Sequence, residues 1–436
     1  MKKIFSIALA ATLLAAGCQK TEVIGTSTTG SKMTFSTEMK KITKAGELPT
    51  GPKANAIGDT NLHEQGFQVW AYADFDISNV ENVDKTPSSN TYLIYDGMAG
   101  MQLKYNKETQ RWNTPDNKEY YWPGTDKELK FFAVSSNQVM TTTGTDAKLA
   151  IDHGIGNNTD GPKITITDFQ LGNNKADEDL MVADFRKQHQ GQNERVVKLN
   201  FHHTLSKVEF KFRTSKINDV LPNVFVQNIL VEDLYNKGTL EVTPKEDDEE
   251  NGNVSTYATD ANDNATVTPV DLDWTKLAGE ADFSYTWHSE TTDENFPSAE
   301  EIEYAETGTQ YSKNALKLTE SAEEFVTWLM IPNISETTPN YLADKYVTIT
   351  YVINKRQFKA KFSLAGQKTV NGENTTYQLP NWDINQYITY TITLAPNLIT
   401  FNASSTDWSK FDGDGDENKD SNGDKINNND DINMNN

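Results

Sequence analysis

Short segments in which every second residue is hydrophobic recur along most of this chain. Alternation of this kind places apolar side chains on one face of a β-strand and polar side chains on the other. Clusters of Asn, Asp, Gly and Pro separate the segments, as is typical of turns between antiparallel strands. The pattern predicts an all-β fold. The expected strands are Phe67-Val69-Ala71, Tyr92-Ile94, Leu103-Tyr105, Leu129-Phe131-Ala133, Ile164-Ile166, Leu180-Val182, Val197-Leu199-Phe201, Val208-Phe210-Phe212, Val226-Ile229-Val231, Phe325-Ile331, Tyr346-Ile353, Phe358-Phe362, Tyr387-Leu394 and Leu398-Ala403.

The expected strands fall into two groups, and the 436 residues are more than a single small domain needs. We therefore predict two tandem antiparallel β-sandwich domains, one over 45–193 and one over 194–411. Helical signals are few. Ser298–Glu301 and Ser321–Glu324 each fit a capping box and predict one or two helical turns.

The N-terminus predicts export. Two lysines precede the apolar run Ile4–Ala16, which is too short for a bilayer-spanning helix, so residues 1–17 are expected to be a signal peptide. Leu14–Cys18 resembles the lipobox of bacterial lipoproteins, which implies that Cys18 becomes the lipidated first residue. Several acyl chains would hold such a protein on the outer membrane. The alternative is an ordinary cleavage site beside an unmodified cysteine.

Residues 18–44 are predicted to be a lipidated propeptide that contains one strand, over 33–39. Met33, Phe35 and Met39 share one face of that strand, so it should be half-buried. The stretch that follows is basic and rich in turn residues, which favours access by a protease. Lys41 and Lys44 are among the basic residues of this stretch.

The charge distribution limits the partners of this chain. Its formal net charge of −23 repels nucleic-acid phosphates, so no nucleic-acid partner is expected. An acidic surface insertion is predicted over 244–267 and a disordered acidic, Asn-rich tail over 412–436. Asp412, Asp414 and Asp416 alternate like the first half of a calcium loop, but the Glu expected at its twelfth position is missing. A solvated tail is favoured over weak calcium binding.

Nothing in the sequence predicts catalysis or a cofactor. The six histidines lack metal-ligand spacing, and His202 and His203 should point to opposite faces of a strand. The nucleophile-elbow, phosphate-loop and zinc-protease motifs are absent from the sequence. We therefore expect a non-enzymatic protein.

Four segments follow the lipobox in order: Tyr120-Tyr121-Trp122-Pro123 with Leu129–Ala133, Val197–Val208, Leu329–Pro332, and Tyr387–Ile392 with Ile399–Phe401 and Trp408. Together they resemble the fimbrillins, the subunits and accessory proteins of the type V pilus of Gram-negative bacteria. Thr43-Lys44-Ala45 is similar to the family's processing site, with lysine where arginine is commoner. The resemblance therefore implies proteolytic processing at Lys44, or at Lys41.

The resemblance implies sandwiches of transthyretin-like, Greek-key type and assembly of pilus subunits through β-strand addition, serving adhesion to a host or bacterial surface. Removal of the propeptide strand would open a site that a strand of another subunit covers. The best donor candidate is the alternating segment Ile399, Phe401 and Ala403. The equal alternative keeps this strand permanently in its own sandwich. A different function is a permanently anchored outer-membrane lipoprotein that binds glycan or protein.

Overall fold

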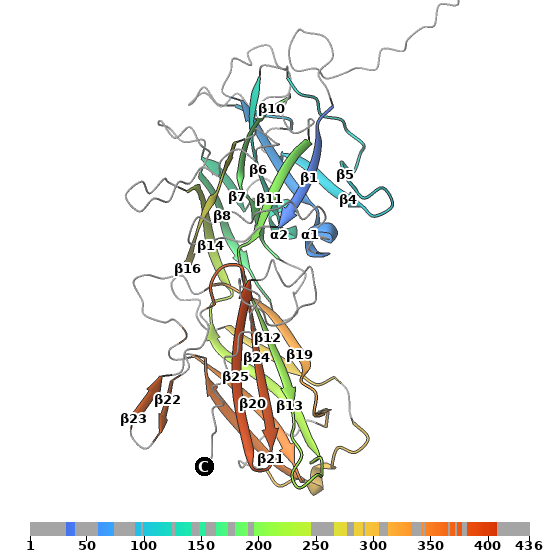
Figure 1. The fold of residues 1–436 in the computed structure, drawn as a ribbon, viewed down its shortest axis with the longest axis vertical. Coiled ribbons are helices and arrows are strands. Elements are labelled where there is room, and N and C mark those ends of the chain that lie inside the picture. The colour runs from blue at the N-terminus through green and yellow to red at the C-terminus, as the bar shows by residue number, and fades with distance from the viewer. Residues whose placement is uncertain are drawn as a thin grey trace, which may run out of the picture.

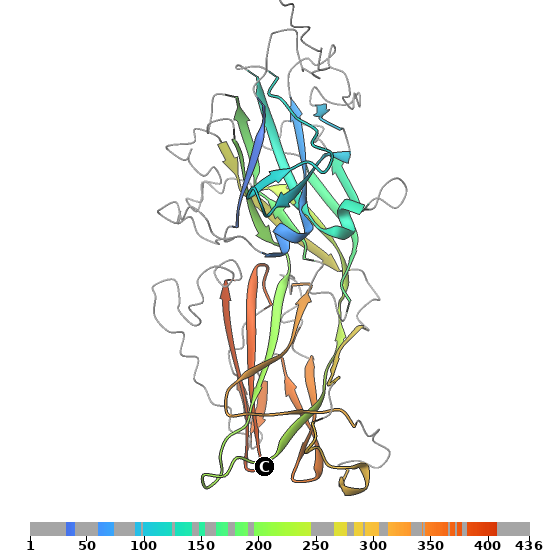
Figure 2. The ribbon, with the colours of Figure 1, turned by 90° about the vertical axis from the view of Figure 1, so that its right-hand side faces the viewer.

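The computed structural model confirms that this is an almost entirely β protein, with two short α-helices among the described residues. The structure describes residues 32–39, 60–73, 92–96, 99–123, 127–141, 148–152, 163–172, 179–190, 196–245, 266–276, 283–290, 293–304, 313–332, 342, 345–364, 367–370, 373–376 and 382–407. Within these ranges the chain forms two pairs of large sheets. Figures 1 and 2 show the two pairs one above the other along the longest axis of the molecule.

The upper pair consists of a ten-stranded sheet I and a four-stranded sheet II. Sheet I has the order β1-β11-β9-β6-β2-β4-β5, and β3, β10 and β15 pair beside this path. The bounds in sheet I are β1 Thr34–Met39, β2 Phe67–Ala73, β3 Tyr92–Ile94, β4 Met101–Asn106, β5 Arg111–Asn113, β6 Glu128–Ser135, β9 Met181–Ala183, β10 Phe185–His189, β11 Val196–His203 and β15 Thr266–Thr268. Sheet II has the order β16-β14-β8-β7, with bounds β7 Leu149–Asp152, β8 Lys163–Gln170, β14 Lys237–Pro244 and β16 Val270–Lys276.

Sheet I buries both of its faces. One face packs on sheet II through a core that joins Trp70 and Phe132 of sheet I to Ile166 and Val242 of sheet II. The opposite face carries a second core, in which Phe131, Trp122 and Phe201 are members. Because strand side chains alternate, neighbours such as Phe131 and Phe132 fill different cores. Sheet I therefore lies between two apolar cores in the upper half.

The lower pair forms one core between sheets III and IV. Sheet III has the order β19-β12-β24-β25, and sheet IV has the order β17-β13-β20-β21 with β18 beside β13. Phe210 and Tyr390 from sheet III pack with Ile349 and Phe362 from sheet IV. The bounds are β12 Ser206–Arg213, β13 Val224–Leu234, β17 Phe283–His288, β18 Leu316–Lys317, β19 Glu323–Met330, β20 Tyr346–Ile353, β21 Arg356–Ser363, β24 Gln386–Ala395 and β25 Leu398–Asp407, and a separate hairpin joins β22 Gln367–Val370 to β23 Glu373–Thr376.

The chain passes between the two halves more often than the predicted boundary at residue 194 allows. Strand β11 pairs with β9 in sheet I, and β12 begins the lower half after a short connection. The chain returns when β14 pairs with β8, and β15 pairs with β10. The assignment of all of 194–411 to the second sandwich is therefore wrong. The bounds of the predicted insertion over 244–267 are also wrong, because Pro244 belongs to β14 and residues 266 and 267 belong to β15. Alternation predicts a strand but not the sheet that it joins.

Of the two predicted helical segments, the first forms a 3-10 turn and the second belongs to a strand. Ser298 caps the 3-10 turn Ala299–Glu301, and its backbone N–H donates to a Glu301 carboxylate oxygen at 3.0 Å, as the capping box predicts. The second capping box is wrong because β19 starts at Glu323 and pairs with β12. Helix α1 spans Thr60–Gln65. Gly66 follows the helix with a φ of +77°, a backbone conformation that favours glycine. Helix α2 spans Asn137–Thr141.

Candidate strand-exchange site

The predicted propeptide strand lies at the edge of sheet I. Strand β1 pairs in parallel with β11, from Thr34 opposite Val196 to Met39 opposite Phe201 (Figure 1). In the described chain this pairing is the one backbone ladder that β1 makes. A parallel edge strand contributed by the extreme N-terminal part of a fold needs no tight turn to reach its neighbour.

The inward face of β1 joins the outer core of sheet I. Met33 is 3 % exposed and belongs to this core, and Phe35 is half-buried against it. The Phe35 ring meets Phe131 edge to face, with centroids 6.5 Å apart. Two of the three residues predicted to face inward therefore do so. Met39 belongs to β1, but its side chain lies outside the described residues.

A side chain from the other edge of sheet I closes over β1. The indole Nε1 of Trp112 in β5 donates to Thr37 Oγ1 at 3.2 Å. Trp112 also packs against Phe67, with ring centroids 4.6 Å apart. Strand β1 therefore lies between β11, with which it pairs, and the β4–β5 hairpin, which it contacts through side chains. We call β11 residues 196–201 together with Trp112, Tyr120 and Phe131 the β1 docking site.

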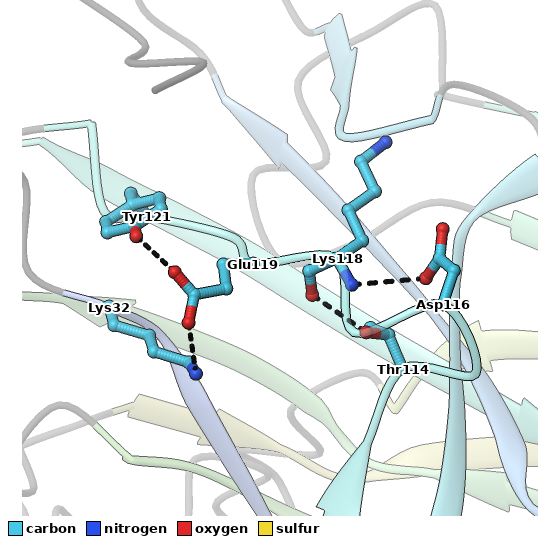
Figure 3. Close-up of polar contacts among 6 residues, drawn as sticks. All are labelled: Lys32, Thr114, Asp116, Lys118, Glu119 and Tyr121. Atoms are coloured by element: carbon cyan, nitrogen blue, oxygen red, sulfur yellow. Dashed lines mark hydrogen bonds and ion pairs between the residues drawn. The ribbon is translucent and has the colours of Figure 1, made fainter. Parts of the chain in front are cut away.

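The segment 119–121 holds the start of β1. The backbone N–H of Met33 donates to the carbonyl of Tyr120 at 2.8 Å. The Lys32 ammonium pairs with the Glu119 carboxylate at 2.7 Å, and the Tyr121 hydroxyl donates to the same carboxylate (Figure 3). The hydrogen bond from Lys32 is the largest cause that holds the pKa of Glu119 below its usual range. The hydrogen bond to Glu119 in turn raises the pKa of Tyr121.

A second set of contacts fixes segment 119–121 itself. Asp96 accepts hydrogen bonds from Lys118 and from the Tyr120 hydroxyl, the latter at 2.5 Å. The Tyr95 hydroxyl donates to the Tyr121 carbonyl. Tyr95 and Asp96 both have positive φ, 61° and 64°, a conformation that costs free energy in residues other than glycine. Figure 3 also shows the preceding turn, in which Thr114 Oγ1 donates to the Lys118 carbonyl at 2.8 Å.

The donor candidates lie in the lower half, in edge strand β25 of sheet III. Phe401 is 2 % exposed and stacks on Phe362 of β21 and Tyr390 of β24, with ring centroids 4.8 and 5.1 Å apart. Ile399 and Ala403 pack partly buried against the same core. All of β25 pairs with β24 in one hairpin. In this state the three donor candidates fill their own sandwich.

Several predicted sites lie outside the described residues: Cys18, Lys41, Lys44, Trp408, and the calcium candidates Asp412, Asp414 and Asp416. Within the described part of the chain, no three His, Cys, Asp or Glu side chains are grouped as a metal ion requires. In that same part, none of the helices has the length and apolar character needed to cross a membrane.

The two neighbouring histidines each contact a buried carboxylate. His202 Nε2 lies 2.8 Å from Asp184 Oδ1, and His203 Nδ1 lies 2.6 Å from Asp179 Oδ2. All four side chains are at most 5 % exposed. Because the two acids flank β9 and the histidines end β11, the pairs tie these neighbouring strands together.

Sequence reasoning missed most of the residues that surround β1. Thr37 and Trp112 are 75 residues apart, and Lys32 and Glu119 are 87 residues apart. Thr37 does lie on the same alternating face as Phe35, which was the available signal. No local pattern indicates which distant side chain a strand will meet.

A family profile assigns this chain to a family, and three solved structures are similar to it at low sequence identity. The fimbrillin-like family profile matches residues 59–408. A crystal structure of a fimbrial protein from Bacteroides vulgatus ATCC 8482 is 15% identical, with a TM-score of 0.46, covering 86% of this chain and 99% of that one. A fimbrial assembly protein from Parabacteroides distasonis ATCC 8503 is 11% identical, with a TM-score of 0.29, covering 80% and 93% of the respective chains.

A third structure, of a protein from Bacteroides uniformis ATCC 8492 assigned provisionally to cell adhesion, is 11% identical, with a TM-score of 0.35, covering 79% of this chain and 91% of that one. Among curated proteins no match is found. The profile match spans well over half of the sequence. This chain belongs to the fimbrillin-like family.

Proposed function

We propose that this chain is the precursor of a fimbrial subunit, structural or accessory, that is assembled by strand exchange at the cell surface and serves adhesion. It is exported as a lipoprotein, held on the outer membrane through Cys18, and cut after Lys44 or Lys41. The observation that carries the proposal is the docking of β1, a strand from before the cleavage site, at the edge of sheet I.

Cleavage changes what holds β1 at its docking site. While the chain is intact, β1 is tethered to the fold and redocks at a high effective concentration. After a cut at Lys44, only the contacts of β1 with the docking site retain it, and dissociation is no longer reversed by the tether. The bare edge of β11 then presents unpaired backbone groups that favour a new strand.

The incoming strand has a substantial driving force. An inserted strand of ~7 residues buries roughly 300 Å² of apolar surface, which corresponds to about 7–8 kcal/mol before ordering costs are subtracted. A donor strand and its docking site are different surfaces, so each subunit can donate to one neighbour and accept from another. Heterologous contacts of this kind propagate into a filament.

Strand β25 of a second copy matches the side-chain sequence of β1. When the two strands are aligned in parallel with Phe401 at the place of Phe35, Ile399 takes the place of Met33 and Ala403 takes the place of Thr37. The order of a large non-aromatic apolar side chain, a phenyl ring and a small side chain is preserved at these three positions, whereas Ser405 falls at the place of Met39. Donation also requires that β25 leaves its hairpin and exposes the core around Phe362, which costs free energy in the donor subunit.

The free-energy cost of releasing β25 from its hairpin favours a second candidate function. Because Phe401 is buried in its own sandwich, the chain can also act as a permanently anchored lipoprotein that binds glycan or protein. Intact-mass measurement of surface material separates the two functions. A mature chain that begins at residue 45 or 42 supports assembly, whereas a chain that still carries an acylated Cys18 contradicts it.

Electron microscopy of fibres tests the donor assignment. The soluble precursor is treated briefly with trypsin, and the original chain is compared with Phe401→Asp and Phe362→Asp. Both substitutions place a charge in the same stacked pair of rings, but only the first changes the donor strand. Loss of fibres with Phe401→Asp alone supports donation by β25. Fibres with both variants, or with neither, contradict it.

A further inference from the structure

Strand β11 pairs with β1 along one edge. Along its other edge, the pairing with β9 covers only part of the strand. Its pairing with β9 covers Phe201, His202 and His203, and the Asp184 N–H then donates to the Asn200 carbonyl at 2.9 Å. Beyond Asp184 the chain bends away, because β10 pairs with β6 on one side and β15 on the other. Among the described residues, β1 flanks residues 196–199 of β11 on one edge, and no strand pairs with them on the other edge, where the backbone ladder has a gap.

Two buried side chains of β10 span this gap. Arg186 Nη1 donates to the Lys198 carbonyl at 3.1 Å, and Gln188 Nε2 donates to the Val196 carbonyl at 3.1 Å. Arg186 Nε also donates to Gln188 Oε1 at 2.6 Å, which fixes the two side chains relative to each other. Arg186 is 2 % exposed and Gln188 is fully buried. Side chains here replace the hydrogen bonds that a neighbouring strand would make.

Both side chains lie on the face of sheet I toward which Phe35 of β1 points. Arg186 is opposite Phe131 in the β6–β10 register, and Gln188 is opposite Leu129. Phe131 is the residue that the Phe35 ring contacts. A guanidinium offers several donors in a rigid plane, so it can bind a side-chain oxygen and a backbone carbonyl at once. A charged group is rarely buried unless such contacts compensate it.

We infer that Arg186 and Gln188 are positioning residues that keep β11 extended after β1 has left, so that the vacated docking site is already shaped for the next strand. None of their contacts to Lys198 and Val196 involves β1, and these contacts therefore persist when β1 departs. An acceptor edge that is already ordered lowers the conformational cost of binding. The inference rests on the strand-exchange function proposed above.

Uptake of a labelled strand tests this role. A site for a specific protease is inserted between residues 40 and 59 of the full chain, which is then cut. A fluorescent synthetic peptide with the sequence of residues 31–41 is added in excess, and its binding is followed by anisotropy. The variants are Arg186→Met, Gln188→Leu and the conservative Arg186→Lys. The matched controls are Arg213→Met, which removes an Arg Nε donor to Thr393 Oγ1, and Gln357→Leu, which removes a buried Gln donor to Gln227, both in the lower half.

Arg186→Met and Gln188→Leu should each weaken peptide binding about tenfold, the factor that ~1.4 kcal/mol produces, whereas Arg186→Lys should recover part of the loss. The controls should bind like the original chain. Amide hydrogen exchange at Val197 and Leu199 should be faster in the two variants when the site is empty and unchanged when β1 is tethered in place. A purely structural role would alter both states.

The outcomes distinguish a failure of strand exchange from a failure of the role assigned to Arg186 and Gln188. If the original chain takes up no peptide, strand exchange itself is contradicted, and this inference with it. If the original chain binds the peptide and Arg186→Met and Gln188→Leu bind it equally well, strand exchange stands and the role of Arg186 and Gln188 is wrong. Because Gln188→Leu leaves the arginine intact, it provides a second reading if Arg186→Met does not fold.

Discussion

Trp112 Nε1 donates a hydrogen bond of 3.2 Å to Thr37 Oγ1, and this contact joins β5 to β1 although the two strands stand at opposite ends of the order of sheet I. Sheet I therefore curves until its two edges meet, and β1 lies where they meet. A strand in that position can be removed without breaking any pairing among the remaining strands. Strand β1 shares this property with other edge strands, and it suits the temporary occupancy proposed above.

The hydrogen bond between Trp112 and Thr37 should slow the release of β1. Thr37→Val keeps the shape of the side chain and removes the acceptor, so retention of β1 should fall by about 1 kcal/mol. The measurement is the rate at which the cut segment leaves the protein, followed by gel filtration of the nicked chain. An unchanged rate would show that the indole and the hydroxyl do not hold β1.

The ring of Phe35 should contribute more than the hydrogen bond does. Phe35→Ala removes its half-buried contact with Phe131, and we expect a loss of ~2 kcal/mol, which accelerates release about thirtyfold. Thr34→Ala is the matched control, because Thr34 belongs to the same strand and is exposed. Equal release rates for Phe35→Ala and Thr34→Ala would contradict the inward orientation of β1.

Acid should weaken the attachment of β1. The pKa of Glu119 is lowered chiefly by its hydrogen bond from Lys32, so the docked state favours the ionised carboxylate. The stabilisation of the docked state by the ionised Glu119 carboxylate is complete above the usual carboxyl pKa. This stabilisation is lost as the pH falls through the lowered pKa. Release of β1 should therefore be faster at about pH 3 than at about pH 6, and Glu119→Gln should reduce the difference.

A matched ion pair provides the control for this pH dependence. Lys216 and Glu320 are also 2.7 Å apart and about equally exposed, but they lie in the lower half. Glu320→Gln should leave the pH dependence of β1 release unchanged. If Glu119→Gln and Glu320→Gln behave alike, the acid effect does not arise at the β1 docking site.

The buried pair of His203 and Asp179 should stabilise the fold rather than the exchange. Asp179→Ala removes the carboxylate from a site with no solvent exposure, and we expect a loss of about 3 kcal/mol in the free energy of unfolding. Asp179→Asn keeps an acceptor and should cost less. Urea unfolding followed by tryptophan fluorescence measures both. A larger loss with Asp179→Asn than with Asp179→Ala would contradict the role of the contact.

The sequence predicts strands well where alternation is strict and flanked by turn residues. The segments around Phe67, Phe131 and Phe210 are strands as expected, and so is the segment around Phe35. Alternation reports burial on one face, which is a local property of the chain. The all-β class therefore follows from the sequence.

Pairing partners were less predictable, because they depend on contacts between distant residues. Strand β14 was not among the expected strands although Leu240 and Val242 alternate with polar residues, and no local signal places it beside β8 rather than in the lower half. The Ser321–Glu324 segment satisfies a helix-capping pattern, but Phe325, Trp328 and Met330 pack in the lower core, and this burial favours the strand β19. Tertiary contacts override a weak local preference here.

The residues of β1 and its docking site were also predictable only in part. Met33 and Phe35 were recognisable from their shared face, whereas Arg186 was not, because an arginine beside a lysine usually lies at the surface. Its burial follows from the bend between β9 and β10, which opens a gap that only a long side chain with several donors can fill. Bends of this kind leave no clear mark in the sequence.

The most direct test of temporary occupancy is a reversible covalent lock on β1. Ser36 and Lys198 are partners in the β1–β11 register, so cysteines at these positions fall within disulfide range. Cys18, the only natural cysteine, is replaced by Ser so that no other thiol interferes. The double variant Ser36→Cys with Lys198→Cys is nicked by trypsin and examined by electron microscopy, oxidised and then reduced. Our account predicts no fibres while the disulfide is closed and fibres once it is reduced; fibres from the oxidised protein would contradict it.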